Sequence, residues 1–364
     1  MRSAGLKVIA GKEFRDHVRS RRFLCLLGIM LVIAAVGLVS GMVQYHKDVE
    51  NYSRACAAIS ENEGATIPFF MKPSPLAAFY QMAFLLSSLG AATGIAMGFD
   101  LVTREKESRS LKILLSHPIY RDEVISGKAL GGMAAIALAV FMLIAVSFAV
   151  LLLFGVVPNL DETIRILIFG ALSFLMIVAF FALSLFFSTV TETSGSALVS
   201  TLIVFITLSS VAYLITSGAG VTVLVGDPPK MPGESYDYTV RTGPDSETGF
   251  CGVSDGGMDP EEFKQKLEEY EAAMTAYQGK RQAVTDVFAL LSPDRNYEKL
   301  SFAVAEPGMA LASRLDPGQE VPESGLSALS GLLGSLAGNI VALLVFPAAF
   351  FGLAWVRFVR EDIR

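Results

Sequence analysis

Charged residues are scarce in this sequence. Asp, Glu, Lys and Arg make up 18% of its 364 residues and hydrophobic residues make up 52%, whereas a soluble domain carries about 25% charge. The mean hydropathy is +0.53. Together with apolar runs longer than about 18 residues, this shortage of charge predicts a polytopic membrane protein and argues against a soluble enzyme or a disordered chain.

Other absences exclude further classes. Three cysteines cannot form a disulfide framework. The net charge of −6 gives no sign of nucleic-acid binding, which would need a concentrated basic face, so no nucleic-acid partner is expected. The three histidines are scattered, and the sequence has neither calcium-loop spacing nor a Gly-x-Ser-x-Gly motif. We therefore expect no catalytic residue, no metal site and no cofactor bound by this chain itself.

Six long runs lack any Asp, Glu, Lys or Arg. The shortest has about 21 residues, enough to cross a hydrocarbon layer of about 30 Å as a helix. The prediction is an all-α integral membrane protein with transmembrane helices at 23–43, 76–99, 129–157, 166–190, 196–217 and 328–356. Buried helices of a large soluble protein are a much weaker alternative. A cleaved signal peptide is a poor match to the first run, which is too long.

Lys and Arg in short loops predict the orientation of the spans. The leader 1–22, the loop 100–128 and the tail after the sixth span together carry sixteen basic residues. The opposite short loops carry only Lys47, Arg54, Lys72 and Arg165. Both termini and the loop 100–128 are therefore expected in the cytoplasm of a multi-pass cell-membrane protein.

The leader 1–22 alternates apolar and charged residues at near-helical spacing. We interpret it as an amphipathic helix in the membrane interface, with Lys and Arg near anionic head groups. A solvated extension of the first span is the alternative.

Between spans five and six lies a long segment, 218–327, with 9 basic and 19 acidic residues. By the count of spans it is an extracytoplasmic domain. Residues 218–260 are rich in Gly and Pro, which predicts loops, and a long amphipathic helix is expected at about 260–291. Cys56 and Cys251 both fall on the outer side, where the question of their pairing stays open. Residues 328–364 then form the sixth span and the cytoplasmic tail.

The loop between spans two and three, 100–128, contains an apolar group rimmed by charges. A short helix from about Glu105 to Ser116 would place three leucines on one side, and Pro118 would end it. An exposed apolar group of this kind needs a partner, which is either the rest of this chain or a separate subunit. The residues that we expect to form this site are Glu105, Glu107, Arg109, Leu111, Lys112, Leu114, Leu115, Pro118 and Arg121.

This loop resembles the signature of ABC-2 type permeases, the membrane subunits of ABC exporters. The matching stretches are Glu105-Lys106-Glu107, Ser110-Leu111, Leu114-Leu115-Ser116, Pro118-Ile119-Tyr120-Arg121 and Gly127-Lys128, with Arg109-Ser110 where the family usually has Gly-Thr. The six spans, the leader and the large outer segment resemble the multi-copper-maturation and sodium-efflux members of this family.

The resemblance implies a permease that forms a translocation pathway with a second permease copy. It also implies that the loop is a coupling helix seated on a separate ABC ATP-binding subunit, which would hold ATP and Mg. Independently, the chain has no Gly-x-x-x-x-Gly-Lys-Ser/Thr motif, so it is not expected to hydrolyse ATP itself.

Two alternatives remain at this stage, a non-transport membrane sensor or assembly scaffold, and an ion-coupled secondary transporter. The absence of acidic or basic residues from the span cores disfavours the second. An uncharged interior also favours hydrophobic or amphipathic cargo.

Small residues recur at four-residue spacing in three spans and predict close helix packing, either within one chain or between two copies. The residues expected to pack in this way are Gly90, Gly94, Gly98, Gly127, Gly131, Gly334 and Gly338.

Overall fold

A computed structural model describes residues 2–61, 73–109, 120–216, 218–230, 260–307, 310, 331, 332, 334 and 336–360. All regular elements among these residues are helices. They form two compact units, one made of residues 210–289 and the other of the remaining chain. The helices are α1 (Arg2–Arg19), α2 (Arg21–Glu61), α3 (Ala77–Gly98), α4 (Thr103–Glu107), α6 (Arg121–Leu153), α7 (Leu160–Val190), α8 (Ser194–Thr216), α9 (Gly218–Val225), α10 (Pro260–Ala289), α11 (Pro293–Ala305) and α14 (Ala337–Arg360).

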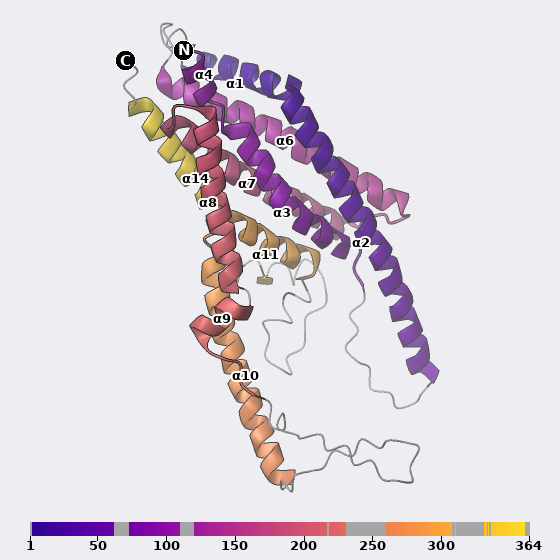
Figure 1. Ribbon diagram of the computed structural model, residues 1–364. Coiled ribbons are helices and arrows are strands. Elements are labelled where there is room, and N and C mark those ends of the chain that lie inside the picture. The colour runs from indigo at the N-terminus through magenta and orange to yellow at the C-terminus, as the bar shows by residue number, and fades with distance from the viewer. Residues whose placement is uncertain are drawn as a thin grey trace, which may run out of the picture. The chain divides into compact units, whose positions relative to one another are not determined.

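Six of these helices are long and apolar enough to cross a membrane: α2, α3, α6, α7, α8 and α14. Each contains one of the six uncharged runs or most of it, so the predicted all-α fold with six spans is confirmed. The helices extend past the runs at several ends because charged residues continue a helix beyond the hydrocarbon layer. Figure 1 shows α2 to be the longest of them.

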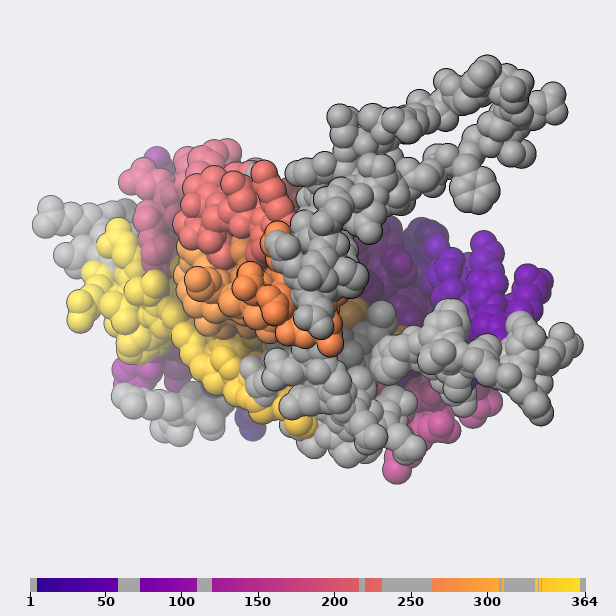
Figure 2. All heavy atoms as spheres, turned by 90° about the horizontal axis from the view of Figure 1, so that it is seen from below, coloured from indigo at the N-terminus to yellow at the C-terminus, as the bar shows by residue number. Residues whose placement is uncertain are grey.

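The helices α3 and α7 form the centre of the first unit. In the most apolar 18-residue stretch of α7, 72% of the residues are buried, compared with 11% in α8 and 17% in α14. Large apolar side chains of α2, α8 and α14 point outward, as expected of helices that meet lipid. Figure 2 shows α14 (yellow) and the far end of α2 (violet) on opposite sides of this unit.

The contact between α3 and α7 depends on glycines. A Cβ added to Gly94 would collide with the carbonyl oxygen of Ile177, and one added to Gly98 would lie 2.7 Å from the carbonyl oxygen of Phe181. Gly90 faces the side chain of Met176 in the same way. Three of the predicted small residues therefore lie against a neighbouring span of the same chain.

The leader is helical and lies along α6 (Figure 1). Ile9, Phe14 and Val18 of α1 pack against the apolar core, whereas Lys7, Lys12 and other basic residues are exposed. The apolar face of α1 is thus covered by protein in this unit.

The helix α11 packs against α3, α7 and α14 (Figure 1). The sequence places residues 293–305 in an outer domain, but by their contacts they belong to the same unit as the spans. Polar side chains of α11 form hydrogen bonds with polar side chains of the spans, and these bonds explain why α11 packs among them. The side-chain amide of Asn339 in α14 donates to the side-chain oxygen of Asn296, Oδ1, at 2.7 Å, and the Tyr297 and Ser173 hydroxyl oxygens are 3.0 Å apart.

The second unit contains the end of α8, the short α9 and the long α10. The helix α10 begins at Pro260 and ends at Ala289, over the range where the sequence predicts a long amphipathic helix. Among the described residues of this unit, α9 and α10 contact each other.

Candidate functional site

The predicted coupling site falls partly outside the described residues. Leu111, Lys112, Leu114, Leu115 and Pro118 lie in 110–119, which the structure does not describe. The flanking residues Glu105, Glu107, Arg109 and Arg121 are described, and they show how the loop 100–128 is joined to the helices around it.

The helix α4 begins directly after α3 and is short. It ends at Glu107, and Arg109 has a positive φ of 54°. A left-handed residue interrupts a right-handed helix, so the expected helix from about Glu105 to Ser116 does not start as one continuous element.

Hydrogen bonds fasten α4 and the residue before it to the end of α7 and the start of α8. The backbone amides of Val102 and Thr103 donate to the Ser188 hydroxyl oxygen at 3.0 and 3.1 Å. The Lys106 ammonium donates to the carbonyl oxygen of Thr189 at 2.7 Å, and the backbone amide of Ser194 donates to the Glu107 carboxylate at 2.6 Å. Each bond joins residues more than 80 positions apart, so these two helix ends hold the first part of the loop in place.

A buried lysine joins α4 to the leader. The Lys128 ammonium, on the second turn of α6, lies 2.7 Å from a Glu13 carboxylate oxygen of α1 and 2.8 Å from a Glu105 carboxylate oxygen of α4. The side chain of Lys128 is only 4% exposed. A charge removed from water in this way is tolerated only with paired acids, and here two helices supply them.

Further polar side chains lie at the ends of the same helices and of α2. Arg22, at the start of α2, pairs with Asp100 at 2.7 Å, and its guanidinium lies over the ring of Phe99. His17 of α1 is largely buried, and this burial lowers the pKa of its imidazole below 6.5, although Glu13 and Asp100 oppose the shift. The ends of α1, α2, α4 and α6 are thus joined by charge as well as by apolar contacts.

The paired charges of this region are suited to holding helix ends together. Among the described residues, no three His, Cys, Asp or Glu side chains come together as metal ligands. Lys128 and Arg22 are each paired with acids, which fixes the relative positions of helix ends that are far apart in sequence.

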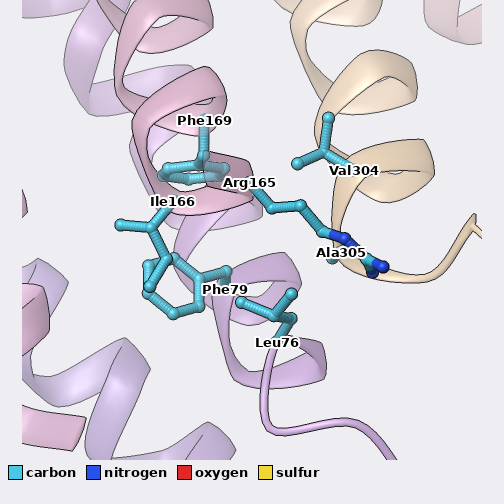
Figure 3. Close-up of a pocket in the computed structure, with 7 residues that line it drawn as sticks. All are labelled: Leu76, Phe79, Arg165, Ile166, Phe169, Val304 and Ala305. Carbon is cyan, nitrogen blue, oxygen red and sulfur yellow. The ribbon is translucent and has the colours of Figure 1, made fainter. Parts of the chain in front are cut away.

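A second polar region lies where α3, α7 and α11 meet. Figure 3 shows Arg165 reaching from α7 past Val304 and Ala305 of α11, beside a small pocket with apolar walls. Arg165 is buried and its guanidinium donates to Asp161 at 2.6 Å. Burial raises the pKa of Glu306, at the end of α11, from 4.5 to about 7, although the charge of Arg165 opposes this shift.

The predicted small residues fall into two groups. Besides the three glycines of α3, a Cβ on Gly127 would lie 2.7 Å from the Ile9 side chain, and one on Gly131 would lie 2.6 Å from Glu13 Cβ. Gly127 and Gly131 of α6 therefore face the leader. In contrast, a Cβ on Gly334 would meet nothing within 4 Å in the described part of the chain, and one on Gly338 would reach only Leu290, at 3.9 Å.

Comparison with known proteins assigns the family. Residues 7–363 match the family described as ABC-2 family transporter protein. The chain belongs to this family. The probable ABC transporter permease protein NosY of Pseudomonas aeruginosa is 27% identical to it over 162 residues, which are 44% of this chain and 50% of that relative. The aligned stretch thus spans about half the length of the relative.

This ABC-2 family protein is a multi-pass membrane protein of the ABC transporter class, since six helices suit a membrane and the family covers nearly the whole chain. The departure of its loop from the family pattern now has a structural meaning. Arg109 stands where the family usually has glycine, and its positive φ is the conformation that glycine adopts most easily.

Sequence reasoning missed several residues that organise this ABC-2 family protein. Glu13 is an acid within a basic leader, close to the apolar positions Ile9 and Phe14, and this placement is a sign of a buried partner. Lys128 was named as a cytoplasmic charge and as part of the Gly127-Lys128 match to the family signature, but its burial and its pairing with Glu13 and Glu105 were not predicted. Asn296 and Tyr297 gave no periodic signal, because their partners lie on other helices.

Proposed function

We propose that the chain is the permease subunit of an ABC-type exporter, that it forms the translocation pathway, and that a separate ATP-binding subunit drives it through the loop 100–128. The ATP-binding subunit would hold ATP and Mg and would perform the hydrolysis. Membership of the ABC-2 family supports an ATP-binding partner.

One observation carries the coupling proposal. The described start of the loop, α4, is fastened to the α7–α8 turn through Lys106 and Glu107 and to α1 and α6 through Lys128. A force applied to this loop would therefore reach α1, α7 and α8 as well as α3 and α6, the two helices that it connects. Such a connection is what the proposed permease needs, because the motion would arise on a separate ATP-binding subunit and would have to be passed to the spans.

We further propose that both termini and the loop 100–128 are cytoplasmic, and that a second permease copy, identical or related, completes the pathway. The apolar side chains exposed on α2, α8 and α14 are suited to lipid and to a neighbouring copy. Chemical crosslinking of the detergent-solubilised complex tests the second copy, and a single permease chain in the active complex would contradict it.

The coupling proposal is tested by changing Leu114 and Leu115 to Asp in the full chain. Charges at these positions would prevent burial of the apolar group, so the variant should insert into the membrane but lose co-purification with the ATP-binding subunit. The matched control changes Val157 and Leu160 to Asp, two exposed apolar residues at the opposite, α6–α7 connection. Unchanged co-purification of the Leu114/Leu115 variant would contradict this docking site.

A further inference from the structure

Three helices meet at a single ammonium group. Lys128 of α6 pairs with Glu13, which lies 115 positions earlier in the chain, and with Glu105. The three side chains are 4%, 12% and 20% exposed, respectively. Glu13 and Glu105 lie on different helices, so Lys128 connects α1 to α4 as well as to its own helix.

The backbone of α1 rests directly on α6. A Cβ added to Gly131 would lie 2.6 Å from Glu13 Cβ and 2.9 Å from the carbonyl oxygen of Ala10. Gly127, one turn earlier, faces Ile9 at 2.7 Å. The Gly-Lys-x-x-Gly pattern at 127–131 therefore has a local explanation, in which the glycines permit the close approach of α1 and the lysine pairs with its acid.

Buried ion pairs contribute little net stability compared with apolar side chains of the same shape. Their better-documented effect is to fix how elements align, because a wrong alignment leaves a buried charge unpaired. Here the alignment concerns the leader and the first part of the loop on which we expect the ATP-binding subunit to act.

We propose that Lys128 is a positioning residue that fastens the leader α1 to the loop 100–128, so that α1, α4 and the start of α6 move as one block when the ATP-binding subunit changes state. The inference rests on the proposed function, since it assumes that this subunit acts on the loop. It assigns the leader a part in transmitting motion, in addition to any contact with head groups.

The test uses the full transporter, reconstituted with its ATP-binding subunit, and hydrogen–deuterium exchange with and without nucleotide. Peptides from α1 and from residues 100–109 report the two sides of the connection. The variant changes Glu13→Gln, Lys128→Met and Glu105→Gln together, which removes the charges without leaving one unpaired, so that the fold is retained. The control is Lys7→Met, which removes an exposed lysine of α1.

In the natural protein and in the control, nucleotide should change exchange in both α1 and residues 100–109. In the triple variant, residues 100–109 should still respond, whereas the nucleotide-dependent change in α1 should be lost. A purely structural role would raise exchange in α1 equally with and without nucleotide while keeping the nucleotide-dependent change, and this result would overturn the proposal.

An α1 response that is unaltered in the triple variant would also overturn the proposal, as would the lack of any α1 response in the natural complex. Failure of the natural chain to bind the ATP-binding subunit is a different result, because it would contradict the proposed function itself.

Discussion

Arg109 has a backbone conformation that favours glycine. Its φ of 54° costs a residue with a side chain about 1 kcal/mol. We predict that Arg109→Gly unfolds at a higher temperature than Arg109→Ala, because both variants lose the charge and only glycine relieves the strain. Thermal unfolding of the two purified variants in the same detergent measures the difference, and a lower unfolding temperature for the glycine variant would contradict the assignment of strain.

Glu306 gives stability an unusual dependence on pH. Burial raises its pKa in the folded protein to about 7, against 4.5 in an ordinary environment, so the folded state holds a proton that the unfolded state releases. This contribution is fully present below pH 4.5 and is lost as the pH rises through about 7. Arg165, which pairs with Asp161, is the nearby cation that limits the shift.

We therefore predict that Glu306→Gln gains stability relative to the natural protein as the pH rises from about 5 to about 8, by about 1 to 3 kcal/mol after allowance for solvent screening. Thermal unfolding across this range measures the difference. A difference between the two proteins that stays constant with pH would show that Glu306 titrates normally.

At the scale of elements, α11 is held among the spans by amide groups. The Asn296 amide donates to the carbonyl oxygens of Leu290 and Ser292, and its own oxygen accepts from Asn339 at 2.7 Å. Ser87, in the middle of α3, donates to Glu298 at 2.7 Å. The middle of α3 lies about 15 Å from either end of that helix. The helix α11 therefore places a carboxylate, Glu298, beside the middle of a span that has no charged residue of its own.

Removal of these amides should loosen α11. We predict that Asn296→Ala destabilises the protein by about 1 to 3 kcal/mol, because it leaves buried partners without hydrogen bonds. Asn339→Ala should add little on top of Asn296→Ala, since the two share one bond. A double-mutant cycle by thermal unfolding measures this coupling, and fully additive effects would show that the 2.7 Å bond contributes nothing.

The spans were predictable from the sequence because a helix that crosses lipid must consist mainly of apolar residues. Uncharged runs that are long enough to cross the hydrocarbon layer are easily recognised. The position of α11 was not predictable, because Asp294, Arg295 and Glu298 make its segment look like a solvated surface. Its burial depends on polar partners in α3, α7 and α14, and such pairings over long distances in the chain leave no local pattern.

The candidate site was predictable to a similar extent. Glu105 and Glu107 were identified from the pattern of the loop, but their partners Lys128 and Ser194 were not, since pairing across helices is a property of the folded chain. The role of Gly127 and Gly131 was predicted as close packing, whereas their neighbour proved to be the leader.

At the scale of the whole molecule, the far end of α2 and the leader α1 together test the orientation. Cys56 is exposed, and it lies 35 residues or about 52 Å along the helix from Arg21, well beyond a hydrocarbon layer of about 30 Å. With Cys25 and Cys251 changed to Ser, we predict that a membrane-impermeant maleimide labels Cys56 on intact cells.

The control carries Gly11→Cys on α1 in a chain without the natural cysteines, because Gly11 is exposed and has open space around it. This cysteine should react only after the membrane is opened. The opposite pattern of labelling would place both termini outside the cell.

The length of α2 has a mechanical consequence. Its 41 residues form one unbroken helix of about 60 Å, roughly twice the thickness of the hydrocarbon layer. The base of this helix is attached at Arg22 to Asp100, immediately before α4. A tilt of only about 5° at that base would displace the opposite tip by about 5 Å, so the length of α2 alone would turn a small rotation at one end into a large displacement at the other.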